Sequence, residues 1–259
     1  MKKHNLTIFA LLLGIILSTS VSHAQSGDLY YYQLKVYHLG PEGQPQAIDQ
    51  YLEEAYIPAL HRAGIAQVGV FHTIEDEAPK IYVLAAYPSL EKAINTESTL
   101  EKDQKYQKAG SDYLNAAYDA APYERIETLL LKAFSGMPAP EAPDLKAPKS
   151  ERFYELRSYE GPTEKLYASK VDMFNKGDEV SIFDRLGFNA VFYAEVLFGG
   201  RMPNLMYMTT FENREERDKL WEDFNNDAAW NKLKAMDQYQ HTVSKADLIF
   251  LRPTAYSDF

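Results

Sequence analysis

The chain has 259 residues, with 37 acidic and 27 basic side chains and a formal net charge of −10. This acidic balance repels phosphate backbones, so nucleic acid is not expected as a partner. The sequence contains no cysteine, which excludes thiol catalysis, covalent haem attachment and cysteine–zinc sites.

The first 24 residues have the pattern of a secretory signal peptide. Lys2 and Lys3 precede an apolar run over 6–17, and the small residues Ser22 and Ala24 suit cleavage before Gln25. The run is shorter than the roughly 20 residues that span a bilayer, which disfavours a membrane anchor. We therefore expect an exported protein, periplasmic or secreted, with no membrane span after the signal is removed.

The mature chain has the length of two domains of about 100–150 residues each. The first domain is assigned to residues 28–134. Alternation and helical spacing predict these elements: a strand over 30–37, a helix over 48–60 kinked at Pro58, strands over 68–74 and 81–87, a helix from the capping residue Ser98 to about Tyr118, and a strand over 126–131.

Residues 135–150 contain four prolines and almost no large apolar side chain, which predicts an extended, semi-stiff linker. The element order then repeats in a second domain over 151–259. It is predicted to contain a strand over 153–159, a helical region over 163–186, strands over 190–197 and 205–211, helices capped by Asn213 and Asp227, and a strand over 248–251.

The two domains repeat residue by residue as well as element by element. Tyr32, Leu34 and Tyr37 recur 122 positions later as Tyr154, Leu156 and Tyr159. The order β-α-β-β-α-β is that of a ferredoxin-like fold, in which helices cover one face of the sheet. An apolar sheet face without a cover is unfavourable in water. We therefore predict an α+β protein whose two tandem ferredoxin-like domains face each other and form a barrel within one chain.

The segment Arg152–Tyr159, RFYELRSY, resembles the NIPSNAP family, together with the strand–turn–strand and tryptophan-bearing helices that follow it. The resemblance covers about 151–256 well. The first domain resembles the family less closely, because Gln33 and Lys35 stand where the motif has glutamate and arginine. The family belongs to the dimeric α+β barrel superfamily, and the resemblance implies that fold. It implies little about chemistry, since that superfamily includes haem-using monooxygenases, isomerases and non-enzymatic binders.

The strand over 153–159 supplies the main candidate site. Tyr154 and Leu156 share one face, and Glu155, Arg157 and Tyr159 share the other. We expect the apolar pair to pack on the helices. The polar trio would then point into the barrel as a ligand site, opposite Lys35 and Tyr37 of the first domain. The guanidinium of Arg157 suits a carboxylate or a phosphate. The alternative is a structural ion pair between Arg157 and Glu155 that closes the barrel and binds nothing.

The histidines of the mature chain, His38, His61, His72 and His241, are not spaced as metal-ligand pairs, so no metal site is predicted. His72 aligns with Tyr193 of the second domain, and both are assigned to the ligand cleft. A structural role for His72 is favoured, with a general base or haem ligand as the alternative.

The sequence therefore favours a small-molecule binder that uses the cleft between the two sheets, without a settled catalytic activity. The first alternative is a monooxygenase-like enzyme of the barrel superfamily that acts on haem or an aromatic compound. The second alternative is a structural or interaction module. No cofactor is assigned, haem remains an alternative, and pairing of two chains is left open.

Overall fold

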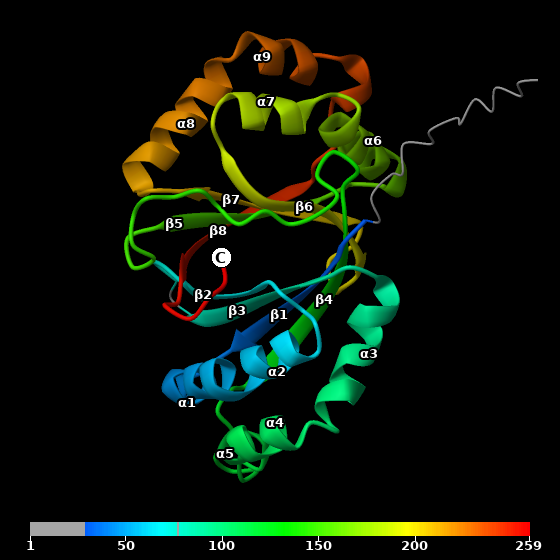
Figure 1. Ribbon diagram of the computed structural model, residues 1–259. Helices are drawn as coiled ribbons and strands as arrows, with labels where there is room; N and C mark the ends of the chain where they lie inside the picture. Colours follow the sequence, from blue (N-terminus) through cyan, green and yellow to red (C-terminus); the bar gives the residue numbers. More distant parts are fainter. Residues whose placement is uncertain (1–28, 77) are drawn as a thin grey trace, which may run out of the picture.

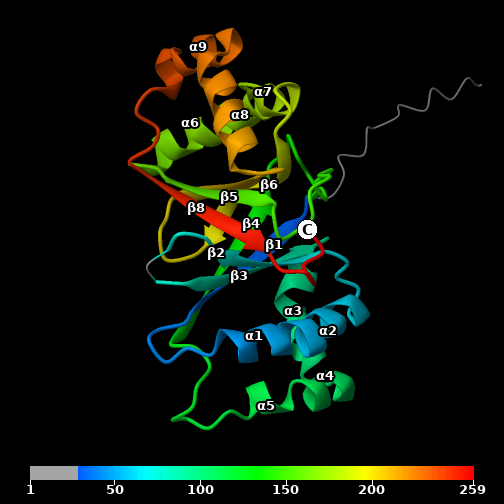
Figure 2. The ribbon, with the colours of Figure 1, turned by 90° about the vertical axis from the view of Figure 1, so that its left-hand side faces the viewer.

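The computed structural model describes residues 29–76 and 78–259. The expected signal peptide, residues 1–24, lies outside the described residues. Within them, two similar halves stack sheet to sheet, and each half carries its helices on the outer side (Figures 1 and 2). None of the described helices is both long and apolar enough to span a membrane.

The first half contains β1 (Tyr31–His38), α1 (Pro45–Tyr51), the π-helical turn η1 (Leu52–Tyr56), α2 (Ile57–Arg62), β2 (Val68–Thr73), β3 (Lys80–Tyr87), α3 (Leu90–Leu100), α4 (Gln104–Ala109), α5 (Ser111–Leu114) and β4 (Arg125–Ala133). The second half contains β5 (Phe153–Glu160), α6 (Glu164–Asn175), α7 (Glu179–Arg185), β6 (Asn189–Phe198), β7 (Asn204–Phe211), α8 (Arg214–Asn226), α9 (Ala228–Lys234), the 3-10 turn η2 (Asp237–Tyr239) and β8 (Lys245–Pro253). The predicted repeat of β-α-β-β-α-β halves is confirmed.

The eight strands form one closed antiparallel barrel in the order β1-β3-β2-β8-β5-β7-β6-β4. Each half contributes four neighbouring strands. The halves join at two seams, where β2 pairs with β8 and β4 pairs with β6. Closure uses the edge strands of both halves, which would otherwise present unpaired backbone groups. The predicted barrel within one chain is therefore confirmed.

The barrel interior is filled by apolar side chains from both halves. The aromatic contacts there cross between the halves. Phe71 of β2 lies 5.3 Å from Tyr154 of β5, and Tyr32 of β1 lies 5.0 Å from Phe192 of β6, measured between ring centroids. These two contacts are equivalent under the internal repeat, so each half supplies one phenylalanine and one tyrosine to its partner half.

Helices cover the barrel on two opposite sides and bury most outward side chains of the strands beneath them, whereas the outward faces of β4 and β8 are partly exposed (Figure 1). In the first half this outer layer is rich in tyrosine, including Tyr51 and Tyr56. In the second half it is built around Phe174, Phe183 and Trp221. The core therefore has three parts: the barrel interior and one helix layer outside each half.

Two helix predictions needed revision. The break expected at Pro58 takes the form of the π-helical turn η1, which precedes the proline. Ser98 does not cap a helix. It lies in the last turn of α3, which begins after the cap Ser89, while α4 is capped by Asp103. The pattern Asn213–Glu216 was assigned correctly, since Asn213 caps α8.

Residues 135–150, predicted to be a linker, contain no helix or strand and pack against the barrel. Leu145 belongs to the apolar cluster of the barrel interior, and Met137 belongs to the helix layer of the second half. The Glu212 carboxylate accepts hydrogen bonds from the backbone N–H groups of Lys146 and Ala147, at 2.9 and 2.6 Å. These two bonds lower the pKa of Glu212 and hold the linker in place.

Candidate functional site

At one end of the barrel the inward-facing positions change from apolar to polar. A pocket of about 410 Å³ opens there between the two sheets, and we call it the barrel-mouth pocket. Its floor is formed by apolar residues of the barrel interior, including Leu34, Val36, Tyr82 and Met206. The polar positions around it are His38, Asp76, Lys80, Glu127, Ser158, Arg201, Asn204 and Asp247.

Most charges at the rim of this pocket are already paired. Arg201 contacts Glu160 and lies 2.5 Å from Asp247, and these hydrogen bonds raise the pKa of Arg201 although its partial burial opposes this. Lys80 donates to Asp76 at 2.8 Å, which lowers the pKa of the Asp76 carboxyl in spite of partial burial. The rim is therefore a set of ion pairs rather than a surface of one sign.

Two features near the floor can recognise a polar group on a ligand. Ser158 and Asn204 are both buried, and Asn204 Nδ2 donates to Ser158 Oγ at 2.9 Å. His38 Nδ1 accepts from Arg125 at 3.0 Å, so its Nε2 carries the proton. That Nε2 is buried and has no hydrogen-bond partner among the described residues. It lies 3.3 Å from Glu127 Oε1 without forming a hydrogen bond.

The predicted site residues of β5 face the other way. Tyr154 and Leu156 point into the barrel, whereas Glu155, Arg157 and Tyr159 point outward under the helices of the second half. The expectation that the trio lines the barrel was therefore wrong. The apolar pair points inward because apolar side chains from both halves fill the barrel interior. The polar trio instead finds its partners on α8 and β7.

The outward trio forms a tightly paired cluster. The fully buried Glu155 accepts from Arg157 and from Arg217 of α8. The Arg157 guanidinium lies 3.4 Å from the centre of the Trp221 ring and donates to Tyr159 Oη at 2.8 Å. The Tyr159 and Tyr207 hydroxyls lie 3.0 Å apart. The predicted ion pair between Arg157 and Glu155 is present, with Arg217 as a partner that the sequence did not indicate.

The other predicted site residues do not converge with this trio. Lys35 pairs with Glu97, and Tyr37 packs in the tyrosine-rich layer, so both also face outward rather than into the barrel. His72 Nε2 lies 2.9 Å from Asp49 at the outer surface. Tyr193 is buried among the rings of the second helix layer. The pair His72 and Tyr193 therefore lines no common cavity among the described residues.

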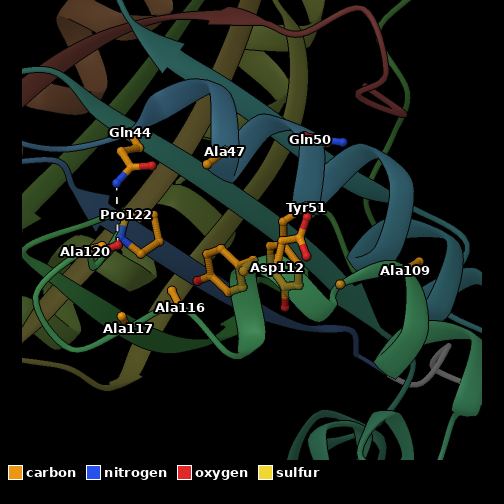
Figure 3. Close-up of a pocket in the computed structure, with 12 residues that line it drawn as sticks. Gln44, Ala47, Gln50, Tyr51, Ala109, Asp112, Ala116, Ala117, Ala120 and Pro122 are labelled. Carbon is orange, nitrogen blue, oxygen red and sulfur yellow. Dashed lines mark hydrogen bonds between the residues drawn. The ribbon is translucent and has the colours of Figure 1, made fainter.

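A further pocket of about 270 Å³ lies outside the first half, between α1 and the segment that follows α4 (Figure 3). Its walls are mostly alanines and two stacked tyrosines, Tyr51 and Tyr113, with ring centroids 3.7 Å apart. The Tyr51 hydroxyl is already bonded to that of Tyr106 at 2.7 Å. The polar residues that line this pocket, Gln44, Gln50 and Asp112, are all exposed, whereas the barrel-mouth pocket combines an apolar floor with the buried Ser158 and Asn204 and is the better candidate.

The described residues contain no group of three or more His, Asp or Glu side chains placed to hold a metal ion. Sequence reasoning missed the polar residues of the barrel mouth. His38 directly follows the strand predicted over 30–37, Ser158 was not singled out within the segment Arg152–Tyr159, and Asn204 carried no motif. The usable signal was the strand alternation, since Ser158 lies two and four positions after Leu156 and Tyr154.

The sequence profile of the NIPSNAP family matches residues 32–128 and 154–258. No curated protein matches the sequence.

Three solved structures are similar in fold. The first is a putative monooxygenase from Lactobacillus acidophilus, with 9% identity, coverage of 87% of this chain and 94% of that chain, and a TM-score of 0.56. The second is a putative monooxygenase from Fusobacterium nucleatum, with 8% identity, coverage of 87% and 92%, and a TM-score of 0.59. The third is an anthrone oxidase-like protein, with 11% identity, coverage of 88% and 93%, and a TM-score of 0.51. At these identities the similarity shows the fold alone.

Proposed function

The chain belongs to the NIPSNAP family, with one family domain in each half, and we propose that it binds a small amphipathic molecule in the barrel-mouth pocket. The observation that carries the proposal is the combination of an apolar floor with His38 Nε2 at its edge, which forms no hydrogen bond within the described residues although Glu127 Oε1 lies 3.3 Å away. The preferred ligand has an apolar body and one hydrogen-bond acceptor. The volume of about 410 Å³ suits such a ligand, since small-molecule sites usually measure about 300–1,000 Å³.

Both halves are needed for this site. Leu34, Val36 and Tyr82 come from the first half, and Met206 and Ile249 come from the second. A ligand on this floor would contact both sheets. Burial raises the pKa of Tyr82, and the carboxylates of Asp76 and Glu127 raise it further, so its hydroxyl stays protonated at neutral pH. The side chains of the floor are therefore uncharged, which favours neutral ligands over charged ones.

We also propose that the mature protein acts outside the cytoplasm. The support is the basic start, the apolar run over 6–17 and the small residues before Gln25. Cell fractionation followed by mass spectrometry tests this proposal. An N-terminus at Gln25 in the exported fraction is expected, whereas a full-length cytoplasmic chain would contradict it.

The binding proposal is tested with 1-naphthol, a neutral fluorescent probe with an apolar body and one hydroxyl. Ile249→Trp replaces a side chain that lines the pocket with a larger indole ring. It should weaken binding at least about tenfold, which corresponds to about 1.4 kcal/mol. His38→Phe keeps a ring but removes the Nε2 donor, and it should weaken binding about fivefold, as expected for one neutral hydrogen bond. Dissociation constants are measured by fluorescence titration of the mature chain.

Two matched controls locate the effect. Ile94→Trp makes the same change at a side chain of α3 that is 64% exposed. His61→Phe makes the second change at a histidine that pairs with Asp258, away from the pocket. Both controls should leave the dissociation constant unchanged. If Ile249→Trp binds the probe as tightly as the unmodified chain, the barrel-mouth pocket is not the site.

A further inference from the structure

The seam between β2 and β8 carries another pocket, of about 570 Å³, which we call the seam pocket. His72 and Arg252 are register partners across this seam. Phe71 and Leu251 point into the barrel, so the neighbouring His72 and Arg252 lie on its outer surface. Lys149 and Ser150 of the linker complete the pocket together with the segment Pro253–Ala255. It shares no lining residue with the barrel-mouth pocket.

The seam pocket concentrates positive charge in a strongly acidic chain. Lys149 and Arg252 line it, and none of the described lining residues carries a carboxylate. This contrasts with the net charge of −10 for the whole chain. Burial lowers the pKa of Lys149, and the nearby charge of Arg152 lowers it further, while Asp258 offsets part of the shift. An anion in the pocket would relieve this repulsion.

Neither Lys149 nor Arg252 pairs with a carboxylate within the described residues. Lys149 donates to the backbone carbonyl of Ser257, which is an uncharged acceptor. His72 uses Nε2 to contact Asp49, which also accepts from the Tyr256 hydroxyl, so the ring is fixed. No ion pair or hydrogen bond of the Arg252 side chain occurs within the described residues, and that side chain is exposed.

Hydroxyl groups add to this set of donors. Thr254 Oγ1 is buried and has no hydrogen-bond partner among the described residues. An unsatisfied buried hydroxyl is costly unless another molecule supplies the partner. Ser150 contributes an exposed hydroxyl from the linker. Pro253 and Ala255 provide an apolar wall beside these groups.

We propose that the seam pocket binds a small organic anion through its carboxylate or phosphate group, with Arg252 and Lys149 holding the oxyanion. Thr254 supplies a further hydrogen bond, the His72 ring lies at the edge of the site, and the body of the ligand packs on Pro253 and Ala255. An arginine fork suits the planar arrangement of oxygens in both kinds of anion. This site goes beyond the proposed function, since it uses other residues and selects an anion rather than a neutral molecule.

The test titrates the mature chain with benzoate, phenyl phosphate and inorganic phosphate by isothermal titration calorimetry. At least one anion should bind, and Arg252→Gln and Lys149→Met should each weaken it at least about tenfold, as expected for a hydrogen bond to a charged group. Binding of benzoate alone would assign a carboxylate, and binding of the phosphates alone would assign a phosphate. The NMR signals of the His72 ring should shift during the titration.

The matched control is Lys146→Met, which removes the same charge from an exposed linker lysine outside the pocket. It should leave the dissociation constant within about twofold, because exposed charges at a distance are largely screened. Equal weakening by this control would mean general charge attraction and would overturn the proposal. The absence of binding for all three anions at millimolar concentration would overturn it as well. Arg252 is exposed, so its variant keeps the test valid if Lys149→Met fails to fold.

Discussion

Replacing Glu155 with alanine is expected to lower the free energy of unfolding by about 3–5 kcal/mol, because two guanidinium groups would lose the carboxylate they share. Glu155 is 0% exposed and accepts from both Arg157 and Arg217. Burial alone would lower the pKa of Arg157, but Tyr207, Tyr159 and Glu155 raise it above the ordinary value. Arg157 therefore keeps its charge in the variant and remains stacked under α8 without a counter-ion.

Urea unfolding followed by tryptophan fluorescence measures this loss, since Trp221 and Trp230 both lie in the second half. Glu155→Gln retains one acceptor and removes the charge, and it should cost about 1.5–3 kcal/mol. Glu97→Ala is the control from the other half, because Glu97 pairs with Lys35, the repeat counterpart of Arg157. Glu97 is half exposed, so its loss should cost at most about 1 kcal/mol. Equal effects of the two alanine variants would contradict the role assigned to burial.

The fold was predictable because the repeat constrains it. Tyr32 and Leu34 recur as Tyr154 and Leu156, and this repeat identifies two equivalent halves whose uncovered sheet faces need each other. The strands, their order and the barrel all follow from that single requirement. The short helices were harder to predict. Ser89 and Ser98 both offer a capping hydroxyl, and only the packing of α3 on its sheet distinguishes them.

The orientation of β5 could not be predicted from alternation alone. Alternation separates Tyr154 and Leu156 from Glu155 and Arg157, but it does not say which set faces the barrel. Both faces of this strand are buried, so polarity gives no direct answer. The orientation of β5 depends on Arg217 of α8, which lies 62 positions after Glu155. Arg217 brings a charged partner to the outer face of the strand. A contact of that range leaves no periodic signal.

The barrel-mouth site was missed for the same reason. Ser158 and Asn204 are polar residues on apolar faces, and each one alone is unremarkable in a strand. They come together because β5 and β7 pair in register, with Ser158 opposite Met206 and Glu160 opposite Asn204. Residues of the first half complete the pocket around them. The sequence predicted a ligand cleft between the sheets, but the residues assigned to it do not line the barrel-mouth pocket.

Replacing Phe192 with alanine is expected to cost about 3–5 kcal/mol and to destabilise both halves together. Phe192 is 0% exposed, and its ring packs against Tyr32 of the other half at 5.0 Å. Removing it leaves a cavity inside the barrel, bounded by strands of both halves. The near-ultraviolet circular dichroism of tyrosine, to which the first half contributes twelve of the 19 tyrosines, should therefore shift together with the tryptophan signal of the second half.

Phe198→Ala is the matched control on the same strand, because Phe198 is 67% exposed. It should change the free energy of unfolding by no more than about 0.5 kcal/mol. Phe71→Ala tests the equivalent contact with Tyr154 and should reproduce the effect of Phe192→Ala, since the repeat relates the two contacts. If Phe192→Ala shifts only the tryptophan signal and leaves the tyrosine signal in place, the halves fold independently. A shared interior could not then be what stabilises the barrel, and a ligand bound at its mouth would stabilise one half alone.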